Sequence, residues 1–302
     1  MTKLLLGFLF AFAFFTNGFS TEYDKVISTM EGIETANQNL VDLIDIGKND
    51  QGTLIRGLKI ELSTEDSWLE AKPAHLVVGV HHGNEGVSSE VALNFANKII
   101  KILKTKEDPM YKFYSGITMY VIPVLNISGF NAGSRYETSV QSKSYDPNRD
   151  YIDPCFTGPS FKLASTSNLA KFLADKNIVG TVTIHGYIGT FTYPWGIYTS
   201  NTKSLDNNFF DKIAKESVKA NGYKVGTHTD IIYPTAGAYE DFAYFKFGIW
   251  TMLLELKRGA SVDNDALSLV TYFSQLPASR SKQHQHLGKC TNVKQDAIKA
   301  RP

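Results

Sequence analysis

The sequence predicts an α/β fold in which helices cover a buried sheet. Short runs rich in β-branched residues, bounded by glycine, proline or polar residues, are typical of buried strands. Longer segments with the apolar spacing of helices lie between these runs, and alternating strands and helices predict helices layered on a sheet. Because no internal repeat, low-complexity tract or Pro/Ser-rich linker divides the chain, we expect one domain after the N-terminal segment.

The predicted domain begins with a helix. Residues 23–43 have apolar positions at helical spacing. Residues 47–57 contain turn-forming residues, and the alternating residues 58–62 then predict the entry to the sheet.

Four strands and four helices follow. The strands are expected at residues 76–80 (LVVGV), 119–124 (MYVIPV), 179–184 (VGTVTI) and 250–254 (WTMLL). The helices are expected at residues 88–103, 165–175, 205–220 and 263–276. These elements alternate along the chain, as the predicted fold requires.

The composition indicates a folded protein whose specificity depends on a local site. The chain has 302 residues, of which 43% are hydrophobic, enough for a sizeable core. Lys and Arg number 31 against 30 Asp and Glu, so no strong field attracts nucleic acid or acidic membranes. We therefore expect no nucleic-acid partner.

Residues 1–20 have the layout of a secretory signal peptide. Lys3 precedes an apolar run over residues 4–15, and the more polar Thr16, Asn17 and Ser20 follow. The alternative, a membrane anchor, would need about 20 apolar residues. We expect cleavage near Ser20, no membrane span in the mature chain, and one domain over residues 21–302 of a secreted or periplasmic monomer.

Cys155 and Cys290 are the two cysteines of the chain. Two thiolates are too few for a structural zinc site, but they can form one disulfide in an oxidising compartment. The alternative is a pair of buried free thiols.

Two histidines and one glutamate follow predicted strands and suggest a metal site. His82 and Glu85 come after the run LVVGV, three residues apart, and His185 ends the run VGTVTI. Open α/β sheets place their sites at the carboxyl ends of strands. Two imidazoles and one carboxylate form a catalytic zinc set that leaves one position open for water. His81 lacks this spacing to Glu85.

Glu255 ends the run WTMLL and is the candidate general base. A carboxylate at a strand end can take a proton from zinc-bound water and pass it to the leaving amine. A His-x-x-Glu pair alone is a weak signal, and Glu255 alone is equally compatible with a salt bridge to Lys257 or Arg258.

Several motifs in order resemble the zinc metallocarboxypeptidases of the carboxypeptidase A type. The motifs are His82-Gly83-Asn84-Glu85, Asn126-Ile127-Ser128-Gly129 before Arg135, Asp146-Pro147-Asn148-Arg149-Asp150, the segment from His185 to Gly196, and Tyr233 twenty-two residues before Glu255. The resemblance runs from about residue 42 to 255. It implies a mixed, about eight-stranded sheet sandwiched between helices, with one Zn²⁺ held by His82, Glu85 and His185.

The resemblance also implies roles for four further residues. Arg149, with Asn148 and the Tyr233 hydroxyl, would hold the terminal carboxylate of a peptide. Arg135 would face the oxyanion that develops when water attacks the carbonyl. The segment over residues 141–145 lengthens the loop between Arg135 and Asn148, which makes the placement of Arg135 the least secure of these.

Glu240 falls at the family position that selects the departing side chain. An acidic residue there predicts a preference for Lys, Arg or a diamino acid, because a cation relieves an unpaired buried carboxylate. In the alternative, Glu240 turns away and Tyr239 or Phe242 lines a pocket for apolar ends.

The remaining histidines, His75, His228, His284 and His286, lack strand-end context, and residues 283–286 are expected to be a solvated terminal segment. The sequence therefore predicts a zinc-dependent carboxypeptidase that acts on peptide or protein C-termini. One alternative is a carboxypeptidase or amidase acting on peptidoglycan peptides, and another is a catalytically silent module that binds peptide C-termini.

Overall fold

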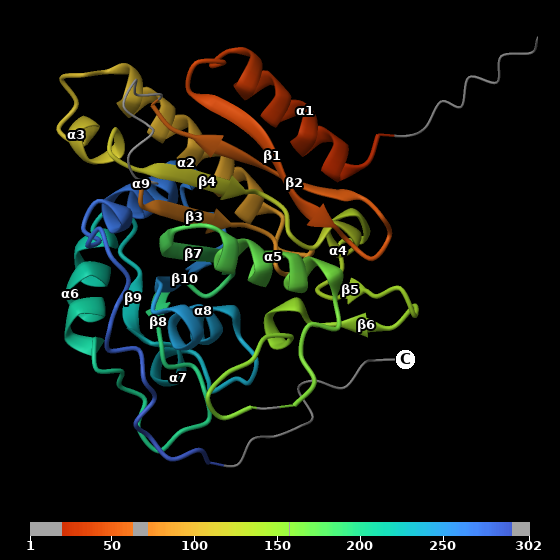
Figure 1. Cartoon of the computed structure of the whole chain (residues 1–302), viewed down its shortest axis with the longest axis vertical. Helices are drawn as coiled ribbons and strands as arrows, with labels where there is room; N and C mark the ends of the chain where they lie inside the picture. The colour runs from red at the N-terminus through yellow and green to blue at the C-terminus, as the bar shows by residue number, and fades with distance from the viewer. Residues whose placement is uncertain (1–19, 63–71, 157, 292–302) are drawn as a thin grey trace, which may run out of the picture.

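The computed structural model describes residues 20–62, 72–156 and 158–291, and within them an eight-stranded mixed sheet lies between helices (Figure 1). This confirms the predicted fold class. The strands, in spatial order, are β1 (Val41–Lys48), β2 (Leu54–Ile60), β4 (Thr118–Ile122), β3 (Ala74–Val78), β7 (Ile178–Gly186), β10 (Trp250–Leu256), β8 (Thr190–Tyr193) and β9 (Lys224–Thr227).

Parallel strands form the middle of the sheet. β4, β3, β7 and β10 are parallel neighbours, whereas β8 runs antiparallel to β10, and β1 and β2 form an antiparallel edge. A separate two-stranded sheet joins β5 (Glu137–Thr138) to β6 (Ser144–Tyr145). The carboxyl ends of β3, β7 and β10 therefore meet at one edge.

Helices cover both faces of the sheet. They are α1 (Glu22–Thr35), α2 (Val87–Lys104), α3 (Tyr111–Tyr114), α4 (Ile127–Ala132), α5 (Ala164–Asp175), α6 (Asn207–Ser217), α7 (His228–Ile231), α8 (Tyr239–Phe247) and α9 (Val262–Phe273). Gly180 of β7 lies against Phe273 and Leu276, so α9, with its neighbour α2, covers one face. Tyr120 of β4 packs on Phe172 of α5, so α5 covers the other face.

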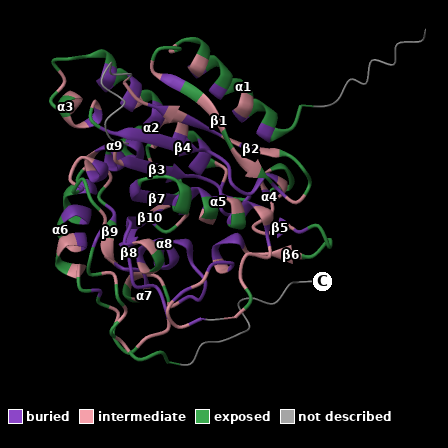
Figure 2. Ribbon diagram, viewed as in Figure 1, coloured by how far each residue is buried: buried purple, intermediate pink, exposed green. Residues whose placement is uncertain are grey.

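The core lies between these layers, where Figure 2 shows the central strands as buried. Every residue of β3 and β4 is buried, which fits the continuous apolar runs in the sequence. Each fully buried Val, Leu, Ile or Phe side chain stabilises the fold by about 1.5–3 kcal/mol.

The helix predicted over residues 23–43 is present at its start but ends earlier than expected. α1 ends at Thr35, and β1 begins at Val41, where a helix was expected to continue to residue 43. The helix starts at a capping box, in which Thr21 Oγ1 accepts from Asp24 N and Asp24 accepts from Thr21 N. The later residues instead pair antiparallel with β2.

The strand expected at residues 58–62 is β2, which begins at Leu54, inside the expected turn region, because residues 54–57 already pair with β1. The eight elements expected after it are present, with boundaries that differ by up to three residues. The sequence patterns missed the short strands β8 and β9 and the helix α8.

The predicted disulfide is present between Cys155 and Cys290, with Cα atoms 5.3 Å apart. It anchors the last described segment, which was expected to be solvated. Gln283 and Gln285 are exposed as expected, whereas His284 and His286 are partly buried, since His284 Nδ1 lies 2.8 Å from Phe245 O and His286 Nε2 lies 2.8 Å from Thr199 Oγ1.

No helix in the part of the chain that the structure describes is long and apolar enough to cross a membrane. Of the predicted signal peptide, residues 1–19 lie outside the described residues.

Candidate metal centre and active site

The candidate site lies at the carboxyl ends of the central parallel strands. The chain leaves β3 and reaches His82 four residues later, whereas His185 and Glu255 lie near the ends of β7 and β10. His185 and Glu255 are register partners, so their side chains emerge side by side on the same face of the sheet.

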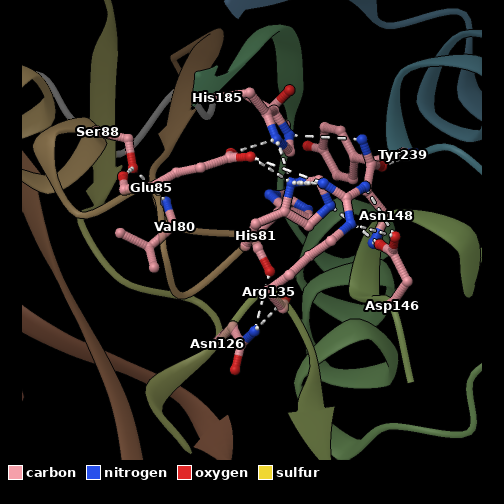
Figure 3. Close-up of polar contacts among 12 residues, drawn as sticks. Val80, His81, Glu85, Ser88, Asn126, Arg135, Asp146, Asn148, His185 and Tyr239 are labelled. Carbon is pink, nitrogen blue, oxygen red and sulfur yellow. Dashed lines mark hydrogen bonds and ion pairs between the residues drawn. The ribbon is translucent and has the colours of Figure 1, made fainter. Parts of the chain in front are cut away.

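A strained backbone turn positions the ligands after β3. Val80 has a φ of +48°, a left-handed conformation that costs a β-branched residue about 1–3 kcal/mol. Two hydrogen bonds hold it, one donated by Val80 N to Ser88 Oγ at 2.9 Å and one accepted by Val80 O from Asn126 N at 3.0 Å. Figure 3 shows the contact between Val80 and Ser88. After this turn His81 packs inward, with Nε2 3.2 Å from Tyr151 Oη.

His82, Glu85 and His185 converge as the sequence predicts. His82 Nδ1 lies 2.9 Å from Glu85 Oε1 and 3.1 Å from His185 Nδ1, and His185 Nδ1 lies 3.0 Å from Glu85 Oε2. All three side chains are buried, and Figure 3 shows Glu85 and His185 directed at one another. Two donors about 2.1 Å from one tetrahedral ion lie about 3.4 Å apart, so this donor set fits Zn²⁺.

Asp146 orients the first ligand, a role that the sequence reading did not assign. Its Oδ1 lies 3.0 Å from His82 Nε2 and accepts a hydrogen bond from the N–H group there. The lone pair of Nδ1 is then left for a metal. Burial alone would raise the pKa of Asp146, but the charges of His82, Arg149 and Arg135 hold it well below its usual value. Its position in the motif before Asn148 was the available signal.

The electrostatics favour a bound cation. Burial raises the pKa of Glu85, but hydrogen bonds from His185 and His82 lower it to about 2, so the carboxylate is ionised. Burial lowers the pKa of His82, yet Asp146 and Glu85 raise it above its ordinary value. A protonated imidazole cannot bind a metal ion, so metal affinity should fall at low pH.

Glu255 lies beside His185 in the sheet and does not form the alternative salt bridge to Lys257 or Arg258. Burial raises the pKa of Glu255, and its Oε2 has no hydrogen-bond partner among the described residues. Arg258, one of the expected partners, lies instead over the Tyr187 ring, 4.8 Å from its centre. A carboxylate with a raised pKa beside a metal site suits general acid–base chemistry.

Arg135 also reaches the site. Its Nε lies 2.9 Å from Asp146 Oδ2, and its Nη1 lies 3.2 Å from His82 Nδ1 and 3.8 Å from Glu85 Oε1. Figure 3 shows its side chain extending toward these groups. The longer loop before Asn148 does not displace Arg135.

The predicted carboxylate-binding residues gather around a short 3₁₀ helix, Pro147–Arg149. Asn148 Oδ1 accepts a hydrogen bond from Tyr239 N at 2.8 Å. Arg149 Nη1 donates to Asn148 O at 2.5 Å, and its Nη2 lies 3.5 Å from the hydroxyl of Tyr233, a side chain that is half exposed.

Glu240 is buried and faces the sheet from α8. Its Oε1 accepts a hydrogen bond from Thr183, two residues before His185, and its Oε2 has no partner among the described residues. Of the two residues that the alternative places in the pocket, Tyr239 contacts Thr181 through Oη, and Phe242 stacks on Tyr151.

His228 was set aside in the sequence reading, yet it lies beside these residues. It directly follows β9, a strand that the sequence patterns missed. The His228 and Tyr233 ring centres are 6.1 Å apart, and His228 Nδ1 lies 3.4 Å from Thr192 Oγ1. Burial, with the charges of Arg149 and His185, lowers the pKa of His228 to about 3.

Comparisons with known proteins concern the family and the fold of the chain. The family model described as zinc carboxypeptidase matches residues 26–285. Carboxypeptidase B of Astacus astacus is 24% identical over 270 residues, which cover 78% of this chain and 86% of that protein. Zinc carboxypeptidase A 1 of Drosophila melanogaster is 27% identical over 74% of this chain and 58% of its own length. The crystal structure of thrombin activatable fibrinolysis inhibitor superposes with a TM-score of 0.73 at 18% identity, covering 83% of this chain and 73% of that one.

Proposed function

Because the chain belongs to the zinc carboxypeptidase family, we propose that it hydrolyses the C-terminal peptide bond of peptides or proteins with one zinc ion. The observation that carries the proposal is the convergence of His82, Glu85 and His185 beside Glu255, with Asn148, which contacts His185, linking the site to Arg149. An exopeptidase needs this combination, since it must recognise a terminal carboxylate and cleave the neighbouring amide.

Glu255 acts as general base and then as general acid. A zinc ion held by the three ligands supplies Lewis acidity toward the carbonyl and the water. Glu255 takes the proton of the attacking water and delivers it to the leaving amine. The burial that raises the pKa of Glu255 supports the first step, since a carboxylate with a raised pKa is a stronger base toward the attacking water.

Arg149 and Arg135 each interact with a different negative charge, Arg149 with the terminal carboxylate of the substrate and Arg135 with the oxyanion. Arg149 offers a planar pair of donors to the terminal carboxylate, with Asn148 and the Tyr233 hydroxyl adding neutral hydrogen bonds. Arg135 stabilises the oxyanion. Its location beside the proposed zinc ligands supports this role.

Glu240 selects a cationic terminal residue, Lys, Arg or a diamino acid. Its buried and partly unpartnered carboxylate supports this preference, because leaving such a group without a cation or a hydrogen bond is costly. Peptidoglycan peptides that end in a diamino acid are therefore a second substrate class to test. The N-terminal residues 1–20 support export to the periplasm or the medium, where we expect a monomer.

The test is the release of terminal residues from a peptide library. Zinc-loaded protein is incubated with peptides of varied C-termini and with peptidoglycan peptides, and mass spectrometry identifies the released residues. We expect single-residue removal with cationic ends preferred. Preferred release of Leu or Phe would refute the role of Glu240 while leaving carboxypeptidase activity intact.

Glu255→Gln provides the matched control. We expect it to retain zinc and to lower kcat by about two to three orders of magnitude, since it removes the proton carrier without changing the ligands. Zinc content is measured by atomic absorption. If wild-type protein with full zinc binds the peptides without cleaving any, the silent binding module replaces the enzyme.

A further inference from the structure

Strand register arranges the site in rows across one face of the sheet. Glu255 of β10 is the register partner of His185 on β7 and of Thr190 on β8, and these three residues form the row that includes the metal ligand and the proposed base. Two residues farther into the sheet, Thr183, Leu253 and Thr192 form the next row. The rows are about 7 Å apart, and Thr183 and Thr192 lie about 10 Å apart on either side of Leu253.

Two polar side chains from different helices stand over the second row. Glu240 of α8 accepts a hydrogen bond from Thr183, and His228 of α7 contacts Thr192 through Nδ1 at 3.4 Å. The row therefore has a carboxylate at one side, an imidazole at the other and an apolar centre at Leu253. This places both groups directly below the reacting row.

Both side chains keep one buried atom unpaired. Glu240 Oε2 and His228 Nε2 have no hydrogen-bond partner among the described residues, and the two residues are 4% and 8% exposed. Buried polar atoms are rarely left unpaired, and those that are need an explanation such as a ligand. The adjacent Asp241 differs, because its two oxygens accept from Gly196 N at 2.9 and 3.1 Å.

The backbone next to His228 has no room for a side chain. A Cβ on Gly196 would lie 3.0 Å from His228 Cδ2 and 3.0 Å from Asp241 Oδ2. The imidazole is thus packed in place against the Tyr193-Pro194-Trp195-Gly196 turn, and it is a fixed hydrogen-bonding group.

We propose, on the basis of the proposed function, that His228 is a second specificity residue and that Glu240 and His228 together favour terminal arginine over lysine. In the tautomer that this proposal assigns, Nδ1–H of His228 donates to Thr192 Oγ1, so Nε2 carries the lone pair and accepts from the departing side chain. A guanidinium has five N–H donors in a planar fork, which serve a carboxylate on one side and an imidazole on the other. The lysine ammonium is a compact point charge and satisfies chiefly Glu240.

The test compares peptides that differ only in a terminal Arg, Lys or Leu. kcat and KM are measured for zinc-loaded wild type, His228→Leu and His228→Gln. We expect wild type to prefer Arg over Lys, and His228→Leu to lower the Arg to Lys ratio of kcat/KM about tenfold, the effect of losing one hydrogen bond to a charged group. His228→Gln, which keeps an acceptor, is expected to restore most of the ratio.

His75→Leu is the matched control. His75 is also buried, has an unpartnered nitrogen and has its pKa lowered to about 3 by burial, but it packs between Phe113 and Phe273 on the opposite face. We expect it to leave the Arg to Lys ratio unchanged. Zinc content and thermal unfolding verify each variant, and His228→Phe replaces His228→Leu if the latter does not fold.

The outcomes separate this inference from the proposed function. Equal losses for Arg, Lys and Leu ends in His228→Leu, or an unchanged ratio, overturn the role of His228 while the enzyme remains a carboxypeptidase. A wild type that cleaves Lys ends better than Arg ends overturns it as well. A zinc-loaded wild type that cleaves none of the three peptides overturns the proposed function and this inference together.

Discussion

Removing Asp146 should weaken zinc binding without touching a ligand. Asp146 accepts from His82 Nε2 at 3.0 Å and pairs with Arg135, whose Nη2 lies 2.8 Å from Oδ2. Asp146→Ala frees His82 to take the other tautomer, in which Nδ1 carries the proton and cannot bind metal. It also leaves Arg135 free to direct its charge at the metal position, since Nη1 is already 3.2 Å from His82 Nδ1.

The expected magnitude follows from what such contacts contribute. Loss of a carboxylate that orients a ligand histidine typically lowers metal affinity 10–100-fold, or about 1.4–2.8 kcal/mol. We place Asp146→Ala at the upper end, because it removes an orienting acceptor and unpairs a neighbouring cation at once. Asp146→Asn should fall at the lower end, since its amide oxygen still accepts from His82 Nε2.

The assay is zinc competition against a chromophoric chelator at fixed pH. Asp263→Ala is the control, because Asp263 is an exposed acid paired with Lys98 and its removal changes the net charge equally. We expect the control to bind zinc like the wild type. If Asp146→Ala and Asp146→Asn both bind zinc within twofold of the wild type, the idea that Asp146 orients His82 is wrong.

Two further predictions concern stability. Burial raises the pKa of Glu137 to about 8, so the folded state keeps a proton that the unfolded state releases above its ordinary pKa. Stability should therefore fall as the pH rises from about 5 to 8, by on the order of 4 kcal/mol from this group. Urea unfolding of Glu137→Gln should show a weaker fall, and identical slopes would contradict the reasoning. The double variant Cys155→Ser, Cys290→Ser removes the disulfide, which joins residues 135 positions apart. It should lower the free energy of unfolding by about 2–5 kcal/mol. An unchanged urea midpoint would exclude a stabilising disulfide.

The metal ligands could be predicted because their signal is local. Each lies at or just after an apolar run, and His82 and Glu85 are three residues apart, so parallel strands are enough to bring them to one edge. Asp146 lies 64 residues from the histidine that it orients. Its contact depends on how the loop before Asn148 folds, which no spacing rule gives.

His228 shows why the other side of the site escaped prediction. Its environment depends on β8 and β9, two four-residue strands that are positioned by pairing with distant residues, β8 with β10 and β9 with β8. The error at β1 has a related cause. Over a short window the apolar residues of 41–48 fit both the helical and the strand periodicity. Pairing with the antiparallel strand β2 selects the strand.

Under the proposed function, the two rows of side chains make reactivity and choice of substrate separate properties of one sheet. His185 and Glu255 are two positions away from Thr183 and Leu253 along the same strands, so substitutions in the lower row would alter the space for a side chain without moving the proposed reacting groups. Retargeting the proposed enzyme would then require changes at Glu240, His228 and the residues beneath them, while the metal ligands and Glu255 stay unchanged.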